Sequence, residues 1–561
     1  MLFVLMLAGI VFARKAIVKN LKAAGLKHLI YLSLVITAFL IAEILLVQPR
    51  NMLFNDEYVF ADIAKSMLFD HVAGVCIFVI DSHCAQNMFG FYQQPTGWPL
   101  LLSISFAIFG VSFGTGYNLV LAISALSIFL VFYLAFILFR NATIATLSSL
   151  FFAFTPLFMT YSRSLVADTP ELSFVLLSIC MVATYFENKS KATTFAAVAS
   201  TAFALILKVE TIIFLLLLFV ILILENKRQN HRLKITKRKI ALALGIVVLL
   251  IPEMVFIYYS WTTNTFGTNQ ARFSFQNFEQ NIFQNLEFWE GKYGSIFFHS
   301  EVFGQPYWQS NIEWPTLYTV FAVLGLVLLF HKKKTRWIAA ILATWFMIVL
   351  VFYTSYYAGG VLFSGGLDAR YFMTAFPVMA ILTANGSYSV VNRVTRILKK
   401  SPAITRLAMP ILVLFILVDP IFEIENIVTR PIQDIYLFSD FRFDEQMASL
   451  YHNVVPHNCI ILTYEPPLWD ILNKSDMYAD LFFNPNYRKE VLNYSHGCVY
   501  LEYSAWCALG QNVTACPRLM KLFNMSEIVS IPYDYPFNFS FLKYNYTLFK
   551  INSYKNGTLL T

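Results

Sequence analysis

The chain has 561 residues, of which 58% are hydrophobic, 17% are aromatic and only 13% are charged, and its mean hydropathy is +0.61. A water-soluble globular protein cannot bury that much apolar surface, and a disordered chain is much poorer in hydrophobic residues. The net charge of +8 comes from short basic runs between apolar stretches, which indicates cytoplasmic loops rather than a nucleic-acid partner. The composition therefore predicts an α-helical polytopic membrane protein.

The first 27 residues combine an apolar run with a basic run. Met1–Ala13 is short for a membrane span, and its positive charges follow it, whereas a secretory signal carries them in front. We expect residues 1–27 to form an interfacial or partly inserted segment on the cytoplasmic side.

Residues 28–424 contain repeated apolar runs of about 20 residues, each long enough to cross a hydrocarbon core of roughly 30 Å. We predict eleven spans, at residues 28–48, 117–139, 143–161, 170–186, 192–207, 211–224, 240–260, 316–331, 337–357, 371–392 and 405–424. Because the basic loops belong on the cytoplasmic side, this arrangement puts the N-terminus in the cytoplasm and the C-terminus outside.

Three stretches are expected on the outer side, namely the loops 49–116 and 261–315 and the C-terminal region 425–561. The last of these has ordinary polarity, with a buried-strand pattern at 458–464, a helix start at 468–472 and a strand at 498–503, so we predict a small extracytoplasmic α/β domain. Seven N-glycosylation acceptor tripeptides begin at Asn473, Asn493, Asn512, Asn524, Asn538, Asn545 and Asn556. They favour a glycosylated surface, the alternative being chance in an Asn- and Ser-rich segment.

The cysteines follow the same division of the chain. The outer regions hold an even number each: Cys76 and Cys84 in the first loop, and Cys459, Cys498, Cys507 and Cys516 in the C-terminal region. This favours one disulfide in the loop and two in the C-terminal region, in an oxidising compartment. A zinc site is less favoured because no C-x-x-C pair occurs, and Cys180, inside a span, is expected to be a packing residue.

Charged residues at the outer ends of the spans are the candidates for function, because charges at membrane depth are costly. They are Asp56, Glu57, Arg163, Asp168, Lys208, Glu210, Asp368 and Arg370. The topology puts all of them at one depth, where a helix bundle can gather them around one cavity. Carboxylates beside cations suit glycosyl transfer from a lipid-linked phosphate donor, since a carboxylate can deprotonate an acceptor hydroxyl while cations neutralise the departing phosphate.

Four segments carry recognisable motifs: Asn55-Asp-Glu-Tyr-Val-Phe-Ala, Gln94-Pro-Thr-Gly-Trp-Pro-Leu with Phe109-Gly, Arg163…Asp168-Thr-Pro, and Asp368-Ala-Arg-Tyr-Phe-Met-Thr-Ala-Phe-Pro. In this order they resemble the segments of GT-C glycosyltransferases, in particular the branch of the dolichyl-phosphate-mannose protein mannosyltransferases and the aminoarabinose transferases of lipid A. The resemblance covers roughly residues 28–425 and implies that residues 98–110 form a helix lying on the membrane. Thr96-Gly97 replaces the second proline of the family's segment, so we expect a local difference in the backbone.

Carried over by position, the resemblance implies that Asp56 is the catalytic base, that Glu57 supports it, and that Asp168 lies near a metal or the acceptor. From charge and depth we add Arg163, Lys208 and Arg370 as contacts of the donor phosphate. The alternatives are that Asp168 caps a helix and that the cations form ion pairs or anchor spans at the interface. His299 and Glu301 are weaker candidates, with loop surface as the alternative. Members of the family differ in metal dependence, so a requirement for Mg²⁺ or Mn²⁺ stays open.

The expected function is transfer of a sugar from a polyprenyl-phosphate donor to an acceptor hydroxyl on the extracytoplasmic face. The expected partners are membrane lipid, the lipid-linked donor and a protein, glycan or lipid acceptor. One alternative is an oligosaccharyltransferase-like GT-C subunit, whose Trp-Trp-Asp motif has only a partial counterpart in Leu468-Trp469-Asp470. Another is a non-enzymatic transporter or scaffold, although transporters place polar groups at mid-membrane. By analogy we expect a multi-pass protein of an archaeal plasma membrane, or of the endoplasmic reticulum membrane in a eukaryote.

Overall fold

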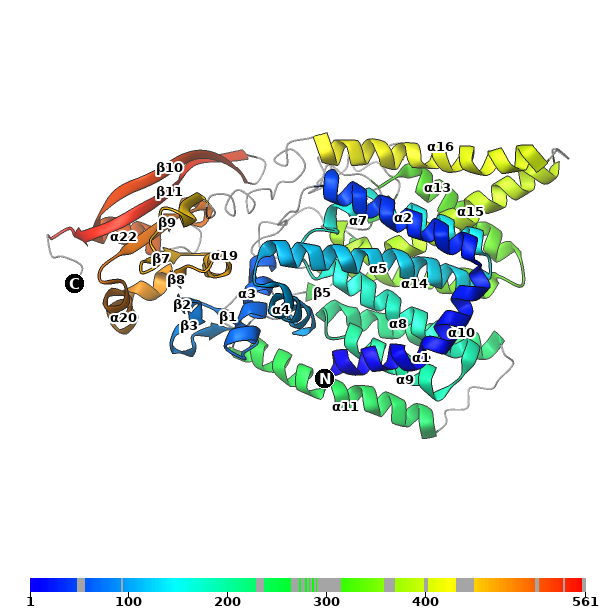
Figure 1. Ribbon diagram of the computed structural model, residues 1–561, viewed down its shortest axis with the longest axis horizontal. Coiled ribbons are helices and arrows are strands. Elements are labelled where there is room, and N and C mark those ends of the chain that lie inside the picture. Colours follow the sequence, from blue (N-terminus) through cyan, green and yellow to red (C-terminus); the bar gives the residue numbers. More distant parts are fainter. Residues whose placement is uncertain are drawn as a thin grey trace.

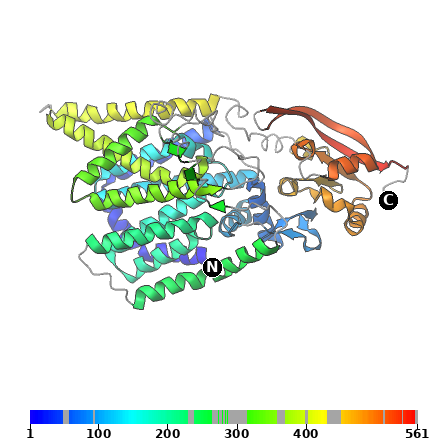
Figure 2. The ribbon, with the colours of Figure 1, turned by 180° about the vertical axis from the view of Figure 1, so that it is seen from behind.

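The computed structural model describes residues 1–47, 56–91, 94–228, 237–263, 314–357, 369–397, 402–429, 450–509, 514–537 and 540–556, together with the short pieces 272–273, 278–279, 282, 285–286, 289 and 448. It consists of a long helical bundle and a C-terminal α/β domain that lies off one end of the bundle (Figure 1). The view from behind shows the same division, with the described part of residues 49–116, in blue, between the two parts (Figure 2). We call this segment the first outer loop after its predicted position, which stays a prediction.

The bundle is built from helices that coincide with all eleven predicted spans. They are α2 (Leu26–Leu45), α5 (Phe113–Phe139), α6 (Ala142–Ala153), α7 (Pro156–Tyr161), α8 (Asp168–Asn188), α9 (Lys191–Ala204), α10 (Phe214–Arg228), α11 (Lys237–Thr263), α13 (Thr316–His331), α14 (Arg336–Ser355), α15 (Phe376–Ile397) and α16 (Pro402–Thr429). Among the described residues, α2, α5, α8 and α14 are long and apolar enough to cross a membrane, and six further apolar helical stretches are shorter. The mainly helical, apolar architecture is therefore confirmed, while the number of spans stays a prediction.

Local sequence signals explain where several of these helices begin. The Asn141 side chain accepts hydrogen bonds from the backbone N–H groups of Thr143 and Ile144, which caps the start of α6. The predicted span 143–161 is divided because Pro156, at the first turn of α7, cannot continue the helix before it. The predicted tenth span likewise begins with a 3₁₀ helix, η5 (Ala369–Ala375).

The N-terminal segment forms α1 (Leu2–Ala24), one continuous helix that includes its basic residues, and its predicted interfacial position stays a prediction. It packs along α9: the rings of Phe3 and Phe203 are 5.5 Å apart, and those of Phe12 and Phe195 are 6.1 Å apart. A Cβ atom added to Gly9 would lie 2.8 Å from the Cα atom of Ala196, so the two helices touch through their smallest residues. Residues 2–24 therefore form part of the bundle; on which side of the membrane the N-terminus lies stays a prediction.

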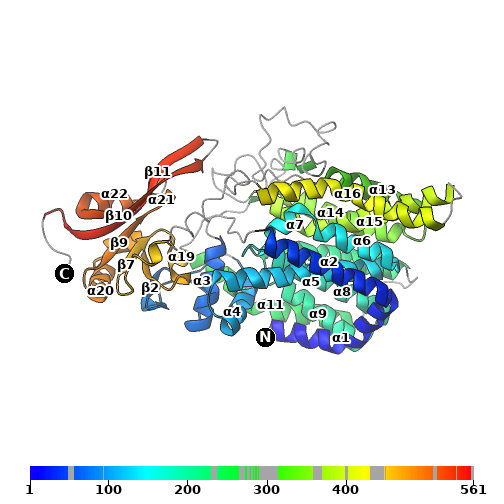
Figure 3. The same ribbon diagram turned by 45° about the horizontal axis from the view of Figure 1, so that its top comes forward.

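Two helices of the first outer loop lie at the end of the bundle that faces the C-terminal domain, α3 (Asp56–Phe69) and α4 (Gly97–Phe109) (Figure 3). The helix expected at 98–110 is thus present. The Gly97 N–H donates to the carbonyl oxygen of Ile206 at 2.8 Å, and a Cβ on Gly97 would come within 2.3 Å of that oxygen. This close approach explains the glycine at a position where the resemblance suggested proline.

The C-terminal domain contains the predicted strand–helix–strand unit, as β7 (Ile460–Thr463), α19 (Pro466–Ile471) and β9 (Val499–Tyr503). The remaining elements are β8 (Ser475–Tyr478), η6 (Ala479–Phe483), α20 (Pro485–Ser495), α21 (Ala505–Leu509), α22 (Ala515–Leu522), β10 (Phe523–Phe537) and β11 (Ser540–Tyr554). In the seven-stranded sheet the order is β10-β11-β9-β7-β8-β2-β3, with β7 parallel to both β8 and β9.

Two strands of this sheet come from the first outer loop, β2 (Phe78–Ile80) and β3 (His83–Cys84). β2 pairs antiparallel with β8, and Phe78 is buried in the core of the C-terminal domain. The other short strands are β1 (Val75–Cys76), paired with β4 (Phe89–Gly90), and β5 (Arg272–Phe273), paired with β6 (Tyr356–Tyr357). The sheet is therefore shared between chain segments almost 400 residues apart, which the sequence did not predict.

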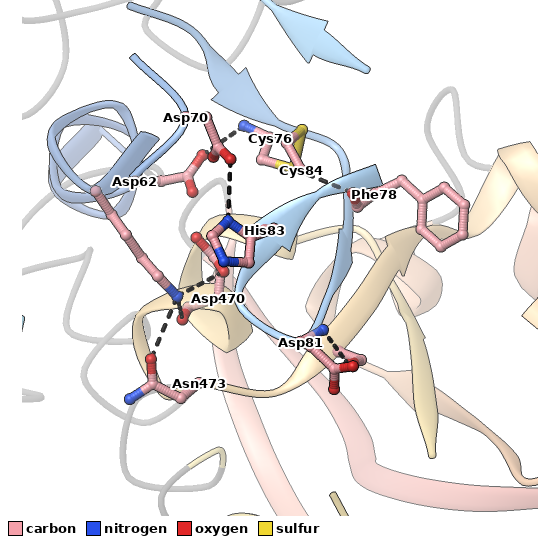
Figure 4. Close-up of polar contacts among 11 residues, drawn as sticks. Asp62, Asp70, Cys76, Phe78, Asp81, His83, Cys84, Asp470 and Asn473 are labelled. Carbon is pink, nitrogen blue, oxygen red and sulfur yellow. Dashed lines mark hydrogen bonds and ion pairs between the residues drawn. A yellow bond between two sulfur atoms is a disulfide. The ribbon is translucent and has the colours of Figure 1, made fainter. Parts of the chain in front are cut away.

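The contact between α3 and the C-terminal domain is polar and buried (Figure 4). The Lys65 ammonium donates to the backbone oxygen and Oδ1 of Asp470, at 2.6 and 2.8 Å, and to Oδ1 of Asn473 at 3.3 Å. On the same helix, Asp62 accepts the N–H of Cys76 at 2.8 Å. Burial, reinforced by the neighbouring Asp470 charge, raises the pKa of the Asp62 carboxyl well above its usual range. We call the Lys65–Asp470 contact the α3 joint.

Disulfides in the structure join Cys76 to Cys84, Cys459 to Cys498 and Cys507 to Cys516, while Cys180 is a buried free thiol. The acceptor asparagines that the structure describes are exposed: Asn473, Asn493, Asn524, Asn545 and Asn556. Asn512 and Asn538 lie outside the described residues. The exposure is compatible with the predicted glycosylation, which stays a prediction.

Candidate functional site

Four of the charged side chains selected from the sequence lie together at the end of the bundle that faces the C-terminal domain. Asp56 begins α3, Asp168 begins α8, Lys208 precedes the 3₁₀ helix η2 (Val209–Ile213), and Arg370 lies in η5. The Arg370 guanidinium is 3.7 Å from Asp56 Oδ2 and 3.8 Å from Asp168 Oδ2. The Lys208 ammonium is 2.8 Å from Asp168 Oδ1. We call these four residues the charged cluster.

The members of the charged cluster differ in accessibility. The Asp56 side chain is 28% exposed, whereas those of Asp168, Lys208 and Arg370 are 5%, 8% and 10% exposed. Asp56 is therefore the most accessible carboxylate of the charged cluster, whereas Asp168 is buried and contacts both cations.

Glu57 and Arg163 lie beside the charged cluster with different partners. Ser164 Oγ donates to the buried Glu57 carboxylate at 3.1 Å, which connects α3 to the segment before α8. Arg163 donates to the backbone oxygens of Glu43 and Val47, at 3.2 and 2.9 Å. Its guanidinium therefore holds the end of α2, and its contact with the donor phosphate stays a prediction.

Sequence reasoning missed Glu171, which extends the cluster along α8 by one helical turn. Lys208 is 3.7 Å from Glu171 Oε2, and the Thr211 hydroxyl donates to Glu171 Oε1 at 2.9 Å. The spacing Asp168-x-x-Glu171 puts both carboxylates on one face of a helix, so this signal was available in the sequence. Two tyrosines were also missed: the Lys208 ammonium and the Arg370 guanidinium lie 4.8 and 5.0 Å from the Tyr371 ring centre, and Tyr353 stacks on Tyr371.

The helix α4 is tied to the segments that carry the charged cluster. The Trp98 indole N–H donates to the carbonyl oxygen of Leu165 at 2.8 Å, just before Asp168. Its neighbour Gly97 contacts Ile206, just before Lys208. The Thr96 N–H and hydroxyl donate to the Glu253 carboxylate of α11 at 2.6 and 2.9 Å. A change in α4 therefore acts directly on the positions of Asp168 and Lys208.

Three of the candidate residues and the possible metal site remain. His299, Glu301 and Asp368 lie outside the described residues. Among the residues that the structure describes, no three His, Cys, Asp or Glu side chains are grouped so that they could hold a metal ion. Asp56 and Asp168 each face Arg370 instead, so we derive no chemical step through a metal, and metal dependence stays a prediction.

The arrangement separates two chemical tasks. A carboxylate can accept a proton from a hydroxyl group, which suits the accessible Asp56. Arg370 and Lys208 together carry two positive charges and up to eight N–H donors, and such groups are typical of phosphate-binding sites. The low exposure of both cations strengthens their electrostatic effect relative to the same charges in water.

The chain resembles known proteins both in sequence and in fold. Residues 93–259 match the family described as dolichyl-phosphate-mannose-protein mannosyltransferase, a stretch that contains Asp168 and Lys208. No match was found among curated protein sequences. Among solved structures, ArnT from Cupriavidus metallidurans in the apo state is 10% identical, with a TM-score of 0.55 and coverage of 93% of this chain and 97% of ArnT.

Two further solved structures are similar. ArnT from the same organism bound to undecaprenyl phosphate is 11% identical, with a TM-score of 0.51 and the same coverage of 93% and 97%. The oligosaccharyltransferase of Archaeoglobus fulgidus is 13% identical, with a TM-score of 0.49 and coverage of 92% of this chain and 74% of that one. The chain thus has the fold of ArnT over nearly its whole length and, in residues 93–259, resembles the dolichyl-phosphate-mannose-protein mannosyltransferases, which agrees with the resemblance found in its sequence.

Proposed function

We propose that this protein transfers a sugar from a polyprenyl-phosphate donor to an acceptor hydroxyl on the extracytoplasmic face of the membrane. The observation that carries the proposal is the charged cluster, in which Arg370 lies between Asp56 and Asp168 while Lys208 contacts Asp168. The match to the mannosyltransferase family and the undecaprenyl phosphate bound by ArnT support the class of donor.

In the proposed reaction the acceptor oxygen attacks the anomeric carbon of the donor sugar, and the bond from that carbon to the phosphate oxygen breaks. Asp56 takes the proton of the attacking hydroxyl, because it is the accessible carboxylate of the charged cluster. The phosphate leaves with the bonding electron pair, and Arg370 and Lys208 stabilise the negative charge that develops on it. Asp168 and Glu171 hold the Lys208 ammonium in place.

The test is transfer of radiolabelled sugar from a panel of polyprenyl-phosphate donors by the full chain in proteoliposomes. We expect Asp56→Asn to fold normally and to lose about 10²–10⁴-fold in rate, the usual contribution of a general base. Asp70→Asn is the matched control, because Asp70 follows the same helix but pairs with His83, away from the charged cluster. Full activity of Asp56→Asn would refute the base, and no transfer by the wild type from any donor, with and without divalent metal, would refute the donor class.

A further inference from the structure

A cavity of about 250 Å³ lies between α5, α8, α10 and α14, and no residue of the charged cluster lines it. Most of its wall is apolar, from Leu134, Ile137, Leu138, Ile179, Ala183, Phe186, Ile221, Ile341 and Leu342 with the indoles of Trp337 and Trp345. Two charged residues complete the lining, Arg140 and Glu187, and both are exposed to solvent. The cavity therefore has an apolar interior and a charged mouth.

The mouth lies at the opposite end of the bundle from the charged cluster. Glu187 is 19 residues after Asp168 on α8, which corresponds to roughly 28 Å along the helix. Arg140 directly follows the last residue of α5, and Trp337 is in the first turn of α14. An indole at a helix end is typical of a membrane interface.

The interior is suited to hydrocarbon. Its volume of about 250 Å³ exceeds that of the apolar cavities of roughly 150 Å³ that stay dry and bind benzene. Ordered water needs several polar partners, and apart from the two charged residues at the mouth the lining offers only the indole N–H groups. An alkyl chain fills such a cavity with dispersion contacts that the empty cavity lacks and leaves no polar group unsatisfied there, so a chain segment is a favourable occupant.

The mouth is suited to a phosphate. Arg140 pairs with Glu187 and donates to Asn20 at 3.3 Å, but a guanidinium has five N–H donors, and this side chain is 47% exposed. Immediately before Trp337 the chain carries Lys332, Lys333, Lys334 and Arg336, all exposed, at the positive N-terminal end of α14. These exposed cations give this end of α14 an excess of positive charge that is complementary to a phosphate, while Arg140 and Glu187 balance each other's charge.

We propose that this cavity binds a membrane glycerophospholipid, with one acyl chain in the apolar interior and the phosphate at Arg140. The site is separate from the proposed donor site, because the phosphate of the sugar donor must lie at the charged cluster, at the other end of α8. The proposal does not depend on the proposed enzymatic function.

The first test is native mass spectrometry of the full chain in detergent, titrated with dioleoylphosphatidylglycerol. We expect Ala183→Phe, which fills part of the interior, and Arg140→Gln, which removes the phosphate contact, each to weaken lipid binding about tenfold, the equivalent of about 1.4 kcal/mol. The matched controls are Val327→Phe on the exposed face of α13 and Lys191→Gln at the start of α9, both of which should bind like the wild type. Thermal unfolding without lipid checks that each variant is folded, and Leu342→Phe replaces Ala183→Phe if the latter is not.

The second test locates the acyl chain. Trp345 lines the cavity and is only 1% exposed, so bromine atoms placed midway along the acyl chain should quench its fluorescence. We expect this quenched component to disappear in Trp345→Phe and to decrease in Ala183→Phe. Equal lipid affinity of the wild type, Ala183→Phe and Arg140→Gln, or quenching that survives Trp345→Phe unchanged, would overturn the proposal. Displacement of the lipid by inorganic phosphate alone would show a phosphate site without a chain site and would also overturn it.

Discussion

At the scale of single residues, Lys208 holds a buried position between two carboxylates of α8. Its ammonium is 2.8 Å from Asp168 and 3.7 Å from Glu171, and its side chain is 8% exposed. Removing one partner of a buried charge pair leaves the other charge uncompensated, which costs more than the pair itself contributes. The charge balance of the site therefore depends on this lysine.

We predict that Lys208→Met destabilises the protein by about 3–5 kcal/mol, because Asp168 and Glu171 are left as neighbouring buried charges. Adding Glu171→Gln to Lys208→Met should recover part of the loss, while Lys191→Met, at an exposed position, should have no effect. Thermal unfolding in detergent measures all four proteins. A Lys208→Met variant as stable as the wild type would show that the lysine does not balance these carboxylates.

A second pair of buried residues lies in the C-terminal domain, away from the bundle. The Glu465 carboxylate accepts the indole N–H of Trp506 at 2.7 Å, and Glu502, buried nearby, accepts hydrogen bonds from Thr463 and Tyr546. Burial, together with the charge of Glu502, raises the pKa of Glu465 from 4.5 to about 8. Glu465 is therefore protonated in the folded domain over most of the physiological range.

This pKa predicts how stability depends on pH. Because the folded pKa is above the unfolded one, the contribution of Glu465 is fully present below about pH 4.5 and is lost as the pH rises through about 8. We expect Glu465→Gln to flatten the fall in melting temperature of the full chain between about pH 5 and about pH 9. The exposed Glu527→Gln is the control. Parallel curves for Glu465→Gln and the wild type would contradict the prediction.

At the scale of elements, α3 connects the candidate base to the C-terminal domain. The helix begins at Asp56 and carries Lys65 between two and three turns later, where the ammonium is enclosed by Asp470 and Asn473. The side chains of Lys65 and Asp470 are only 2% and 4% exposed. Because α3 is a continuous helix, fixing Lys65 also restricts the movement of Asp56 at its start. The α3 joint therefore contributes to the position of Asp56 relative to Arg370.

We predict that Lys65→Met, which leaves the Asp470 carboxylate buried without its cation, costs about 3–5 kcal/mol in stability. If the proposed function is right, sugar transfer should also show a lower kcat. Asp470→Asn combined with Lys65→Met should recover stability without restoring kcat, because the helix is no longer held. The control is Lys489→Met on the exposed side of α20. Additive effects of the two substitutions in a double-mutant cycle would contradict a direct interaction.

At the scale of the whole molecule, the first outer loop and the C-terminal domain share one sheet and one hydrophobic core. β2 extends the sheet of the domain through β8, and the ring of Phe78 lies in the same core as Ile460, Leu462 and Met477. The Cys76–Cys84 disulfide closes the hairpin that presents this ring. The domain therefore does not have its own complete sheet without a segment of the bundle's loop.

We predict that Phe78→Ala lowers the stability of the C-terminal domain by about 3–5 kcal/mol, although Phe78 lies far from the domain in sequence. Hydrogen exchange of β7 and β9 peptides in the full chain measures this effect, since their protection depends on the sheet remaining closed. Phe12→Ala, at an exposed site of α1, is the control. Unchanged protection in Phe78→Ala would show that the domain folds independently of the loop.

The sequence by itself determined the apolar helical bundle, the approximate ends of most of its helices and the four charged residues that lie together in the charged cluster. The reason is that an apolar run in a membrane must satisfy its backbone hydrogen bonds internally, and that charges tolerated beside such runs are restricted to a few depths. Asp56, Asp168, Lys208 and Arg370 could be selected because each ends or begins an apolar segment. Glu171 could have been selected by the same argument from its spacing to Asp168.

Only the tertiary structure decided the direction of side chains and the partners of distant segments. Arg163 is as well placed in sequence as Arg370, yet it donates to the end of α2. The helix α1 runs through the basic residues of 1–27 and packs on α9 through Gly9 and Ala196, a contact that the sequence did not indicate. A strand as short as β2 has too few residues to show the alternating hydrophobic pattern from which strands are predicted. The pairing of Phe78 with Met477 joins residues almost 400 positions apart, and no local sequence pattern specifies such a partner.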